Sequence, residues 1–308
     1  LAPANGTIYE IEASLLTITR RVRAGNAAIA MRLSPAGHAL WVLCKDPASL
    51  VEIPFETMRP GRHIRLAAPP TDFDLSRETG DACVVSSGGR TVSIVSLAQA
   101  SVSRTIQAAT EPSIARFRGD GRQLITGSHA DRSLTLYDVP TGKTVVRLPL
   151  SIAPREFCFT ADGGHLYVTG DGMDAVVSVF PYRTEVWETL PAGHAPGAMA
   201  IAESDRPPAY LLVANPDADS VTVLDVETGK LVAVVQVGRE PRQIVITPDN
   251  QYALVLNEKS GDMAVIRIFS LSGSQVGGNR VKRYKSAPLF TMIPVGERPV
   301  GAAVVALI

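Results

Sequence analysis

The chain has 308 residues, and its 30 Lys and Arg balance 30 Asp and Glu, so the formal net charge is zero. This balance lacks the clustered positive charge that duplex nucleic acid or an anionic membrane attracts, and we expect neither as a partner. No apolar run is long enough to span a membrane, and Cys44, Cys83 and Cys158 form neither a disulfide framework nor a metal-binding pattern.

The first predicted elements are two strands near the N-terminus, GTIYEIEA at 6–13 and LLTITRRVR at 15–23. They match the third and fourth strands of units found later in the chain, for which DSVTVLDVETG at 219–229 is a good parallel. Outer strands of this kind need inner strands from elsewhere. We therefore expect the two ends of the chain to meet in one sheet.

A turn that precedes a strand then recurs along the chain. It is written SPAGHALWV from Ser34, SRETGDACVV from Ser76, RGDGRQLIT from Arg118 and TADGGHLYV from Thr160, and these starts lie 42 residues apart. Looser copies begin at Glu203 and Thr247. Each unit contains four short runs rich in Val, Ile, Tyr and Phe, punctuated by Gly, Pro, Asp or Asn. Repeated units of four short antiparallel strands are typical of a β-propeller.

Seven such units predict an all-β fold, a seven-bladed β-propeller of four-stranded antiparallel blades in a single domain spanning residues 1–308. We expect PVGAAVVALI at 299–308 to supply the innermost strand of the last blade and the N-terminal segment to supply its outer strands. No second strand is visible for that blade, which leaves it three-stranded. SLSGSQVGGNRVKRYKSA at 270–287 interrupts the sixth unit, and we expect it to form an inserted loop.

HLYVTGDGMDAVVSVF from His165 and YLLVANPDADSVTVLDVETGKLVAVVQVGREPRQIVITPDN from Tyr210 resemble the repeats of YVTN-family β-propellers. The second stretch covers almost a whole unit, including an Asp- and Asn-rich loop, a Thr-Gly turn and a VGxxP motif before the next inner strand. The resemblance extends over residues 110–301. The family includes surface-layer, periplasmic and secreted proteins, and similar repeats occur in lactonase-like and haem-d1-type propellers.

Local catalytic and metal motifs are absent from the sequence. TGKT at 141–144 ends like a phosphate-binding P-loop, but Tyr137 stands where that motif needs glycine, and the near copy DVETGK at 225–230 indicates a hairpin turn. There is no G-x-S-x-G motif, so no catalytic residue is assigned. The acidic loops DGMD, NPDADS and NEKSGD lack calcium-binding spacing, and we expect their side chains to bond turn backbone. We predict no metal and no cofactor.

Charged residues recur on the predicted innermost strands. Two positions before successive turn starts stand Arg32, Asp74 and Arg116, an alternation that predicts an arc of ion pairs between adjacent blades. Close by, Arg155, Glu156 and Arg242 are expected at the mouth of the central channel. There the guanidinium groups either pair across blades or bind an anionic ligand, since guanidinium grips carboxylate and phosphate.

Two histidines fall in loops expected at one rim of the ring, His129 in GSHADRS and His194 in PAGHAPG. Each is either a solvated loop residue or a contact for a ligand, including axial ligation of haem. Neither has the spacing to a second His, Cys or carboxylate that metal binding requires.

These observations favour a non-enzymatic propeller that binds an unknown protein or a small anionic ligand at its rim and channel mouth. One alternative is a lactonase-like hydrolase, which needs one or two carboxylates to converge with a His or Arg. The other is a haem-d1-type cofactor-binding propeller. The chain opens on Leu1, from which we expect a removed leader segment and a periplasmic, secreted or cell-surface protein. We expect a monomer.

Overall fold

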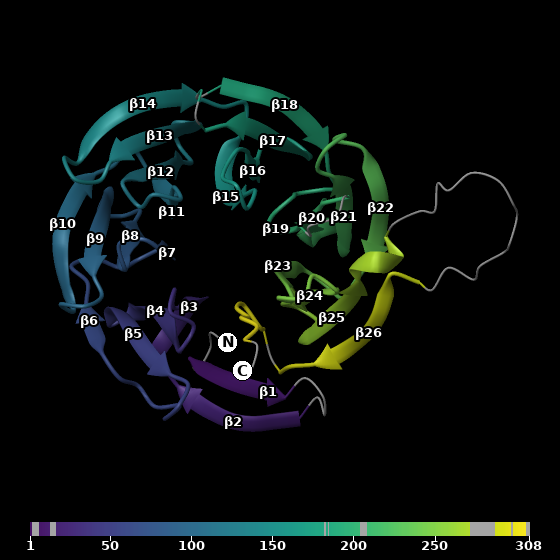
Figure 1. Ribbon diagram of the computed structural model, residues 1–308, viewed down its shortest axis with the longest axis horizontal. Coiled ribbons are helices and arrows are strands. Elements are labelled where there is room, and N and C mark those ends of the chain that lie inside the picture. Colours follow the sequence, from purple (N-terminus) through teal and green to yellow (C-terminus); the bar gives the residue numbers. More distant parts are fainter. Residues whose placement is uncertain are drawn as a thin grey trace, which may run out of the picture.

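The computed structural model describes residues 1, 6–12, 17–181, 183, 185–203, 208–271, 287–296 and 298–305. In this part of the chain, six four-stranded antiparallel sheets and one two-stranded sheet are arranged as a ring (Figure 1). Strands follow one another from the inside of each sheet to its outside. The predicted all-β propeller with four-stranded antiparallel blades is confirmed.

The strands are grouped by blade as follows. Blade 1 holds β3 (Asn26–Leu33), β4 (Ala39–Asp46), β5 (Ala48–Pro54) and β6 (His63–Arg65), and blade 2 holds β7 (Asp72–Leu75), β8 (Asp81–Ser86), β9 (Thr91–Ser96) and β10 (Ser101–Gln107). Blade 3 holds β11 (Pro112–Phe117), β12 (Gln123–Ser128), β13 (Ser133–Asp138) and β14 (Lys143–Pro149), and blade 4 holds β15 (Ala153–Phe159), β16 (Leu166–Asp171), β17 (Ala175–Phe180) and β18 (Glu185–Pro191). Blade 5 holds β19 (Met199–Ala202), β20 (Tyr210–Asn215), β21 (Ser220–Asp225) and β22 (Leu231–Gln236), and blade 6 holds β23 (Pro241–Ile246), β24 (Tyr252–Asn257), β25 (Asp262–Arg267) and β26 (Leu289–Pro294).

The recurring turn joins the first and second strands of a blade. In five blades the residue that starts the turn donates its backbone N–H to the carbonyl five positions later, from Ser34, Ser76, Arg118, Thr160 and Thr247. Because the same hydrogen bond closes the turn in each of these blades, the turn has the same length in each of them. The predicted Thr-Gly hairpin turn joins the third and fourth strands, and Gly142 and Gly229 there have φ of 71° and 66°.

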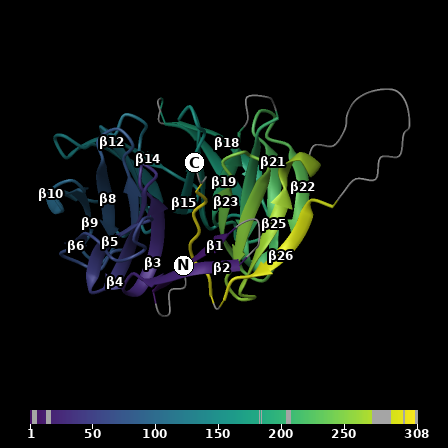
Figure 2. The same ribbon diagram turned by 60° about the horizontal axis from the view of Figure 1, so that its bottom comes forward.

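The seventh blade is built differently. It consists of β1 (Thr7–Glu12) paired with β2 (Thr17–Arg23), together with both ends of the described chain. Leu1 N–H donates to the carbonyl of Gly301 at 2.8 Å, and Val300 N–H donates to the carbonyl of Leu1 at 3.0 Å. Leu1 and residues 300–301 therefore meet on the inside of the ring, as predicted, and the C-terminal segment runs on from there along the inside of the ring (Figure 2).

One detail of the predicted closure is wrong. Residues 299–305 lie at the innermost position of blade 7 but do not form a regular strand. Leu1 is bonded to this segment by two backbone hydrogen bonds, which are too few for a ladder. Among the described residues, the blade is therefore a two-stranded sheet with irregular inner segments.

The hydrophobic core lies between blades rather than within one of them. Six clusters of buried residues each combine side chains from two adjacent blades. For example, Phe73 of blade 2 packs with Trp41 and Leu50 of blade 1. Burying side chains of this size contributes about 1.5–3 kcal/mol each, so stacking neighbouring blades is the main stabilising contribution to the ring.

Two short 3₁₀ helices, η1 (Pro216–Ala218) and η2 (Ile268–Ser270), are the helices of the described chain, and neither has the length to cross a membrane. Of the predicted insertion at 270–287, residues 272–286 lie outside the described residues. The three cysteines are free, with Cys44 and Cys83 buried and Cys158 half-buried.

Candidate functional site

The inner face of the ring presents strand edges that need hydrogen-bond partners. The innermost strand of each blade has a neighbouring strand on one side only, so backbone N–H and C=O groups on its other side are left over. In this protein, polar side chains from the preceding blade bond to several of them. On β3, Arg32 donates from Nε to the carbonyl of Phe73 on β7, at 2.9 Å.

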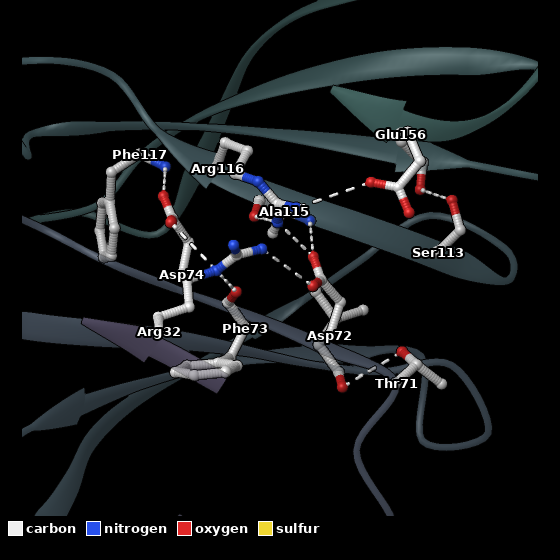
Figure 3. Close-up of polar contacts among 12 residues, drawn as sticks. Arg32, Thr71, Asp72, Phe73, Asp74, Ser113, Ala115, Arg116, Phe117 and Glu156 are labelled. Atoms are coloured by element: carbon white, nitrogen blue, oxygen red, sulfur yellow. Dashed lines mark hydrogen bonds and ion pairs between the residues drawn. The ribbon is translucent and has the colours of Figure 1, made fainter. Parts of the chain in front are cut away.

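Two carboxylates of β7 make the same kind of bond to β11 (Figure 3). The Asp72 Oδ2 atom accepts the backbone N–H of Ala115 at 3.2 Å, and the Asp74 Oδ2 atom accepts that of Phe117 at 3.0 Å. Asp72 also accepts a hydrogen bond from Nη1 of Arg116. These contacts tie blade 2 to blade 3 through both backbone and side-chain groups.

The structure brings Arg32, Asp74 and Arg116 together, with one change from the predicted arc. Asp72, rather than Asp74, is the carboxylate that bonds to Arg116, and Arg32 lies between both carboxylates at 3.6 and 3.7 Å. Burial raises the pKa of Asp74, and Arg116 and Arg32 offset that effect only in part. For Arg116, burial acts to lower the pKa, but the charges of Asp72, Asp74 and Glu156 outweigh it and raise the pKa above its usual value.

Uncharged side chains connect other blade junctions. On β11, the Ser113 hydroxyl donates to the carbonyl of Pro154 at 2.7 Å, and on β16, the Thr169 hydroxyl donates to the carbonyl of Gly197 at 2.7 Å. Gln243 on β23 accepts the N–H of Ala302 at 2.7 Å. The polar residues of the inner face thus share one structural role, which is to bond each blade to the next. Most of the charged groups on this face take part in these bonds.

Glu156 on β15 is different. Its nearest described ionic partner is Arg116, whose Nη2 lies 4.0 Å from Oε2, too far for a hydrogen bond. Among the described residues, no group donates a hydrogen bond to this carboxylate. The side chain is 43% exposed, toward the inside of the ring, yet the surrounding protein still raises the pKa of Glu156 through desolvation. A carboxylate in this state is available to a ligand.

Arg155 is adjacent to Glu156 in sequence but belongs to a separate cluster at the rim. Asp171, at the end of β16, accepts hydrogen bonds from Nε of Arg155 at 2.9 Å and Nε2 of His129 at 2.8 Å. Burial acts to raise the pKa of Asp171, but the bonds from His129 and Arg155 prevail and lower it. The second nitrogen of His129 lies 3.9 Å from Glu111.

His194 forms another pair on the neighbouring loop. Its Nδ1 lies 2.9 Å from Oδ2 of Asp174, whose other oxygen accepts the backbone N–H of Ala195 at 3.0 Å. The hydrogen bond with Asp174 raises the pKa of His194 and lowers that of Asp174. The structure therefore places His129 and His194 on different carboxylates, Asp171 at the end of β16 and Asp174 in the β16–β17 loop.

Arg242 lies two blades away from Arg155 and is bonded to Glu240 and Glu258. Whether either arginine binds an anionic ligand stays a prediction. Arg155 and Arg242 each contact carboxylates of their own blade region. Within the described residues, no group of three His, Cys, Asp or Glu is positioned to hold a metal ion. Two of the three acidic loops bond to backbone as expected, through Asp174 to Ala195 and Asp219 to Glu240, whereas Asp262 of the third accepts a hydrogen bond from the Asn257 side chain.

Comparisons with known proteins agree with this architecture. The family described as "Lactonase, 7-bladed beta-propeller" matches residues 86–275, more than half of the chain. The chain belongs to this family. Within the lactonase propeller family, the match supports seven blades, of which the structure shows six with four strands and a seventh formed with the termini.

One curated protein and one solved structure are also similar to the chain. The seven-bladed beta-propeller protein Rv1057 of Mycobacterium tuberculosis is 25% identical over 150 residues, which cover 48% of this chain and 38% of that protein. The match therefore spans well under half of the relative's length. Among solved structures, the hydrazine synthase of Kuenenia stuttgartiensis superposes with a TM-score of 0.73 at 19% identity, covering 87% of this chain and 94% of that one. At this identity, the likeness shows the shared fold.

Proposed function

We propose that this propeller binds a small polar molecule on the inner face of its ring, at Glu156 and Arg116. The observation that carries the proposal is that the Glu156 carboxylate has no hydrogen-bond partner among the described residues. Around it, Arg32, Asp72 and Asp74 are engaged in ties between blades, whereas Glu156 accepts no hydrogen bond from the described residues and is open to solvent.

Arg116 supplies the complementary group. Its Nη1 bonds to Asp72 and to the carbonyl of Ala115, while Nη2 points to Glu156 across 4.0 Å (Figure 3). A ligand hydroxyl or carbonyl placed between them would accept from Nη2, and a hydroxyl would also donate to Glu156. The pair thus suits a molecule that carries both kinds of group, such as a hydroxylated cyclic ester.

Hydrolysis of a lactone is a second candidate, favoured by the raised pKa of Glu156 and by the family. In that reaction the Glu156 carboxylate takes a proton from water as the water oxygen attacks the ester carbonyl, and Arg116 stabilises the negative oxygen that forms. The ring C–O bond then breaks, and the leaving oxygen receives the proton from Glu156. The product is the ring-opened hydroxy acid.

One set of measurements tests both candidates. Calorimetry with glucono-δ-lactone, γ-butyrolactone and their hydroxy acids measures binding, and acid release at constant pH measures hydrolysis. We expect saturable binding that is weakened at least about tenfold in Glu156→Gln, with the exposed control Glu188→Gln unchanged. Turnover that is lost in Glu156→Gln would establish hydrolysis. Binding that persists unaltered in Glu156→Gln would contradict the site.

A further inference from the structure

Three basic side chains form a compact group on the rim, where blades 5 and 6 meet the C-terminal segment. Arg242 lies on β23, Lys259 in the β24–β25 loop, and Arg298 after β26. Lys259 Nζ lies 2.9 Å from Glu240, and Arg298 Nη2 lies 2.7 Å from Glu258. Arg242 bonds to both carboxylates. Glu240 thus links Lys259 to Arg242, and Glu258 links Arg242 to Arg298.

The cations of this group face solvent and the carboxylates lie beneath them. Glu240 and Glu258 are 16% and 13% exposed, whereas Arg242, Lys259 and Arg298 are 45%, 69% and 72% exposed. The hydrogen bond from Lys259 is the main cause that lowers the pKa of Glu240, so this carboxylate stays ionised near neutral pH. The five described side chains carry three positive and two negative charges, which leaves one net positive charge at the surface.

The carboxylates also hold the cations in position without using all their donors. Arg242 bonds through Nε and Nη2, and Arg298 bonds through the same two atoms, so Nη1 of each makes no hydrogen bond to the described residues. Lys259 has three N–H donors and one described partner. Side chains that are already ordered lose less conformational entropy when they bind a ligand.

We propose that Arg242, Lys259 and Arg298 form a binding site for a phosphate group, either inorganic phosphate or a phosphate monoester. A phosphate dianion offers several acceptor oxygens, and it matches donors that approach from three separate side chains. Its charge also meets the net positive charge of the group. The site lies on the rim and does not depend on ligand binding at Glu156.

Calorimetry at low ionic strength tests the site with inorganic phosphate and glycerol 3-phosphate, and with glycerol as a negative control. We expect saturable binding of both phosphates, weakened about tenfold in Arg298→Gln and in Lys259→Gln. Tighter binding of glycerol 3-phosphate would identify the ester as the source, and equal binding would identify the free anion. The matched control is Arg183→Gln, an exposed arginine on the β17–β18 turn that pairs with Glu185.

Several results would overturn the proposal. These are no saturable phosphate binding by the unmodified chain, unchanged affinity in both Arg298→Gln and Lys259→Gln, or an equal loss in Arg183→Gln. Circular dichroism checks that each variant is folded. Phosphate binding that survives in Glu156→Gln keeps this site separate from the inner-face site, so that failure of one proposal is distinguishable from failure of the other.

Discussion

At the scale of single residues, Asp72 and Asp74 each accept a backbone hydrogen bond from β11, but only Asp72 also accepts one from the Arg116 side chain. Asp72 bonds to Ala115 N–H and to the guanidinium of Arg116, whose side chain is only 13% exposed. We expect Asp72→Ala to lower the free energy of unfolding by about 2–4 kcal/mol, because it leaves the largely desolvated charge of Arg116 without its closest partner. Asp74→Ala removes one bond to Phe117 and should cost about 1–2 kcal/mol.

Urea-induced unfolding at neutral pH measures both values, with Asp72→Asn as a control that keeps an acceptor for Ala115. An equal loss in the two alanine variants would show that Arg116 is compensated by other carboxylates, and the assignment of Asp72 as its main partner would be wrong.

Glu156 should make stability depend on pH. Desolvation raises its folded-state pKa above the ordinary value of 4.5, so the folded chain binds more protons than the unfolded chain in the interval between the two pKa values. Stability from this group is therefore complete below pH 4.5 and falls as the pH rises through the folded pKa. We expect Glu156→Gln to unfold at a higher temperature than the unmodified chain at pH 8, with the difference shrinking toward pH 4.

Thermal unfolding followed by circular dichroism across this pH range provides the measurement. A constant difference between the two proteins at all pH values would mean that Glu156 is not desolvated in the fold. A stability cost borne by an unpaired carboxylate is also what a binding site predicts, because its missing partner arrives with the ligand.

At the scale of elements, the two Thr-Gly turns are chemically alike but differ in their surroundings. Both Gly142 and Gly229 have positive φ, which costs an alanine about 1 kcal/mol. A Cβ at Gly142 would have no neighbour closer than 3.5 Å, whereas at Gly229 it would lie 2.8 Å from Leu190 of the preceding blade. We expect Gly142→Ala to cost about 1 kcal/mol and Gly229→Ala at least about 1 kcal/mol more. Equal costs in urea unfolding would count against the contact with Leu190.

The sequence predicts these elements well because their chemistry is local. Each repeated turn closes with a bond between residues five apart, so the same few residue types recur every 42 positions. It also identifies Arg32, Asp74 and Arg116, whose charge alternates at one repeat position. It does not single out Asp72, since its bond to Ala115 spans 43 positions and depends on how far one blade is rotated against the next.

The same limit applies to the rim residues. The fold distributes the five residues of the predicted channel-mouth set over four places. Arg155 and His129 meet at Asp171, His194 at Asp174, Arg242 at Glu258, and Glu156 faces Arg116. Sequence spacing cannot show which carboxylate each one meets, because Asp171, Asp174 and Glu258 all fall at or just after the end of a second strand. The Arg298–Glu258 contact, 40 positions apart, has no signal in the repeat pattern.

At the scale of the whole molecule, ring closure depends on contacts between the two ends of the chain and β23. Gln243 bonds to both backbone groups of Ala302, accepting its N–H at 2.7 Å and donating to its carbonyl at 3.4 Å. An amide side chain thereby replaces the strand pairing that the irregular C-terminal segment lacks. Val300 is held separately, through the carbonyl of Leu1.

Gln243→Ala should therefore loosen closure at one point. We expect hydrogen exchange at the Ala302 amide to accelerate by about five- to tenfold, which corresponds to a lost bond of about 1–1.4 kcal/mol, while the Val300 amide keeps most of its protection. Gln243→Glu retains the acceptor and should preserve protection at Ala302. If both amides exchange faster together, the C-terminal segment detaches as a unit. Unchanged exchange at Ala302 would mean that blade packing, rather than Gln243, holds the ring shut.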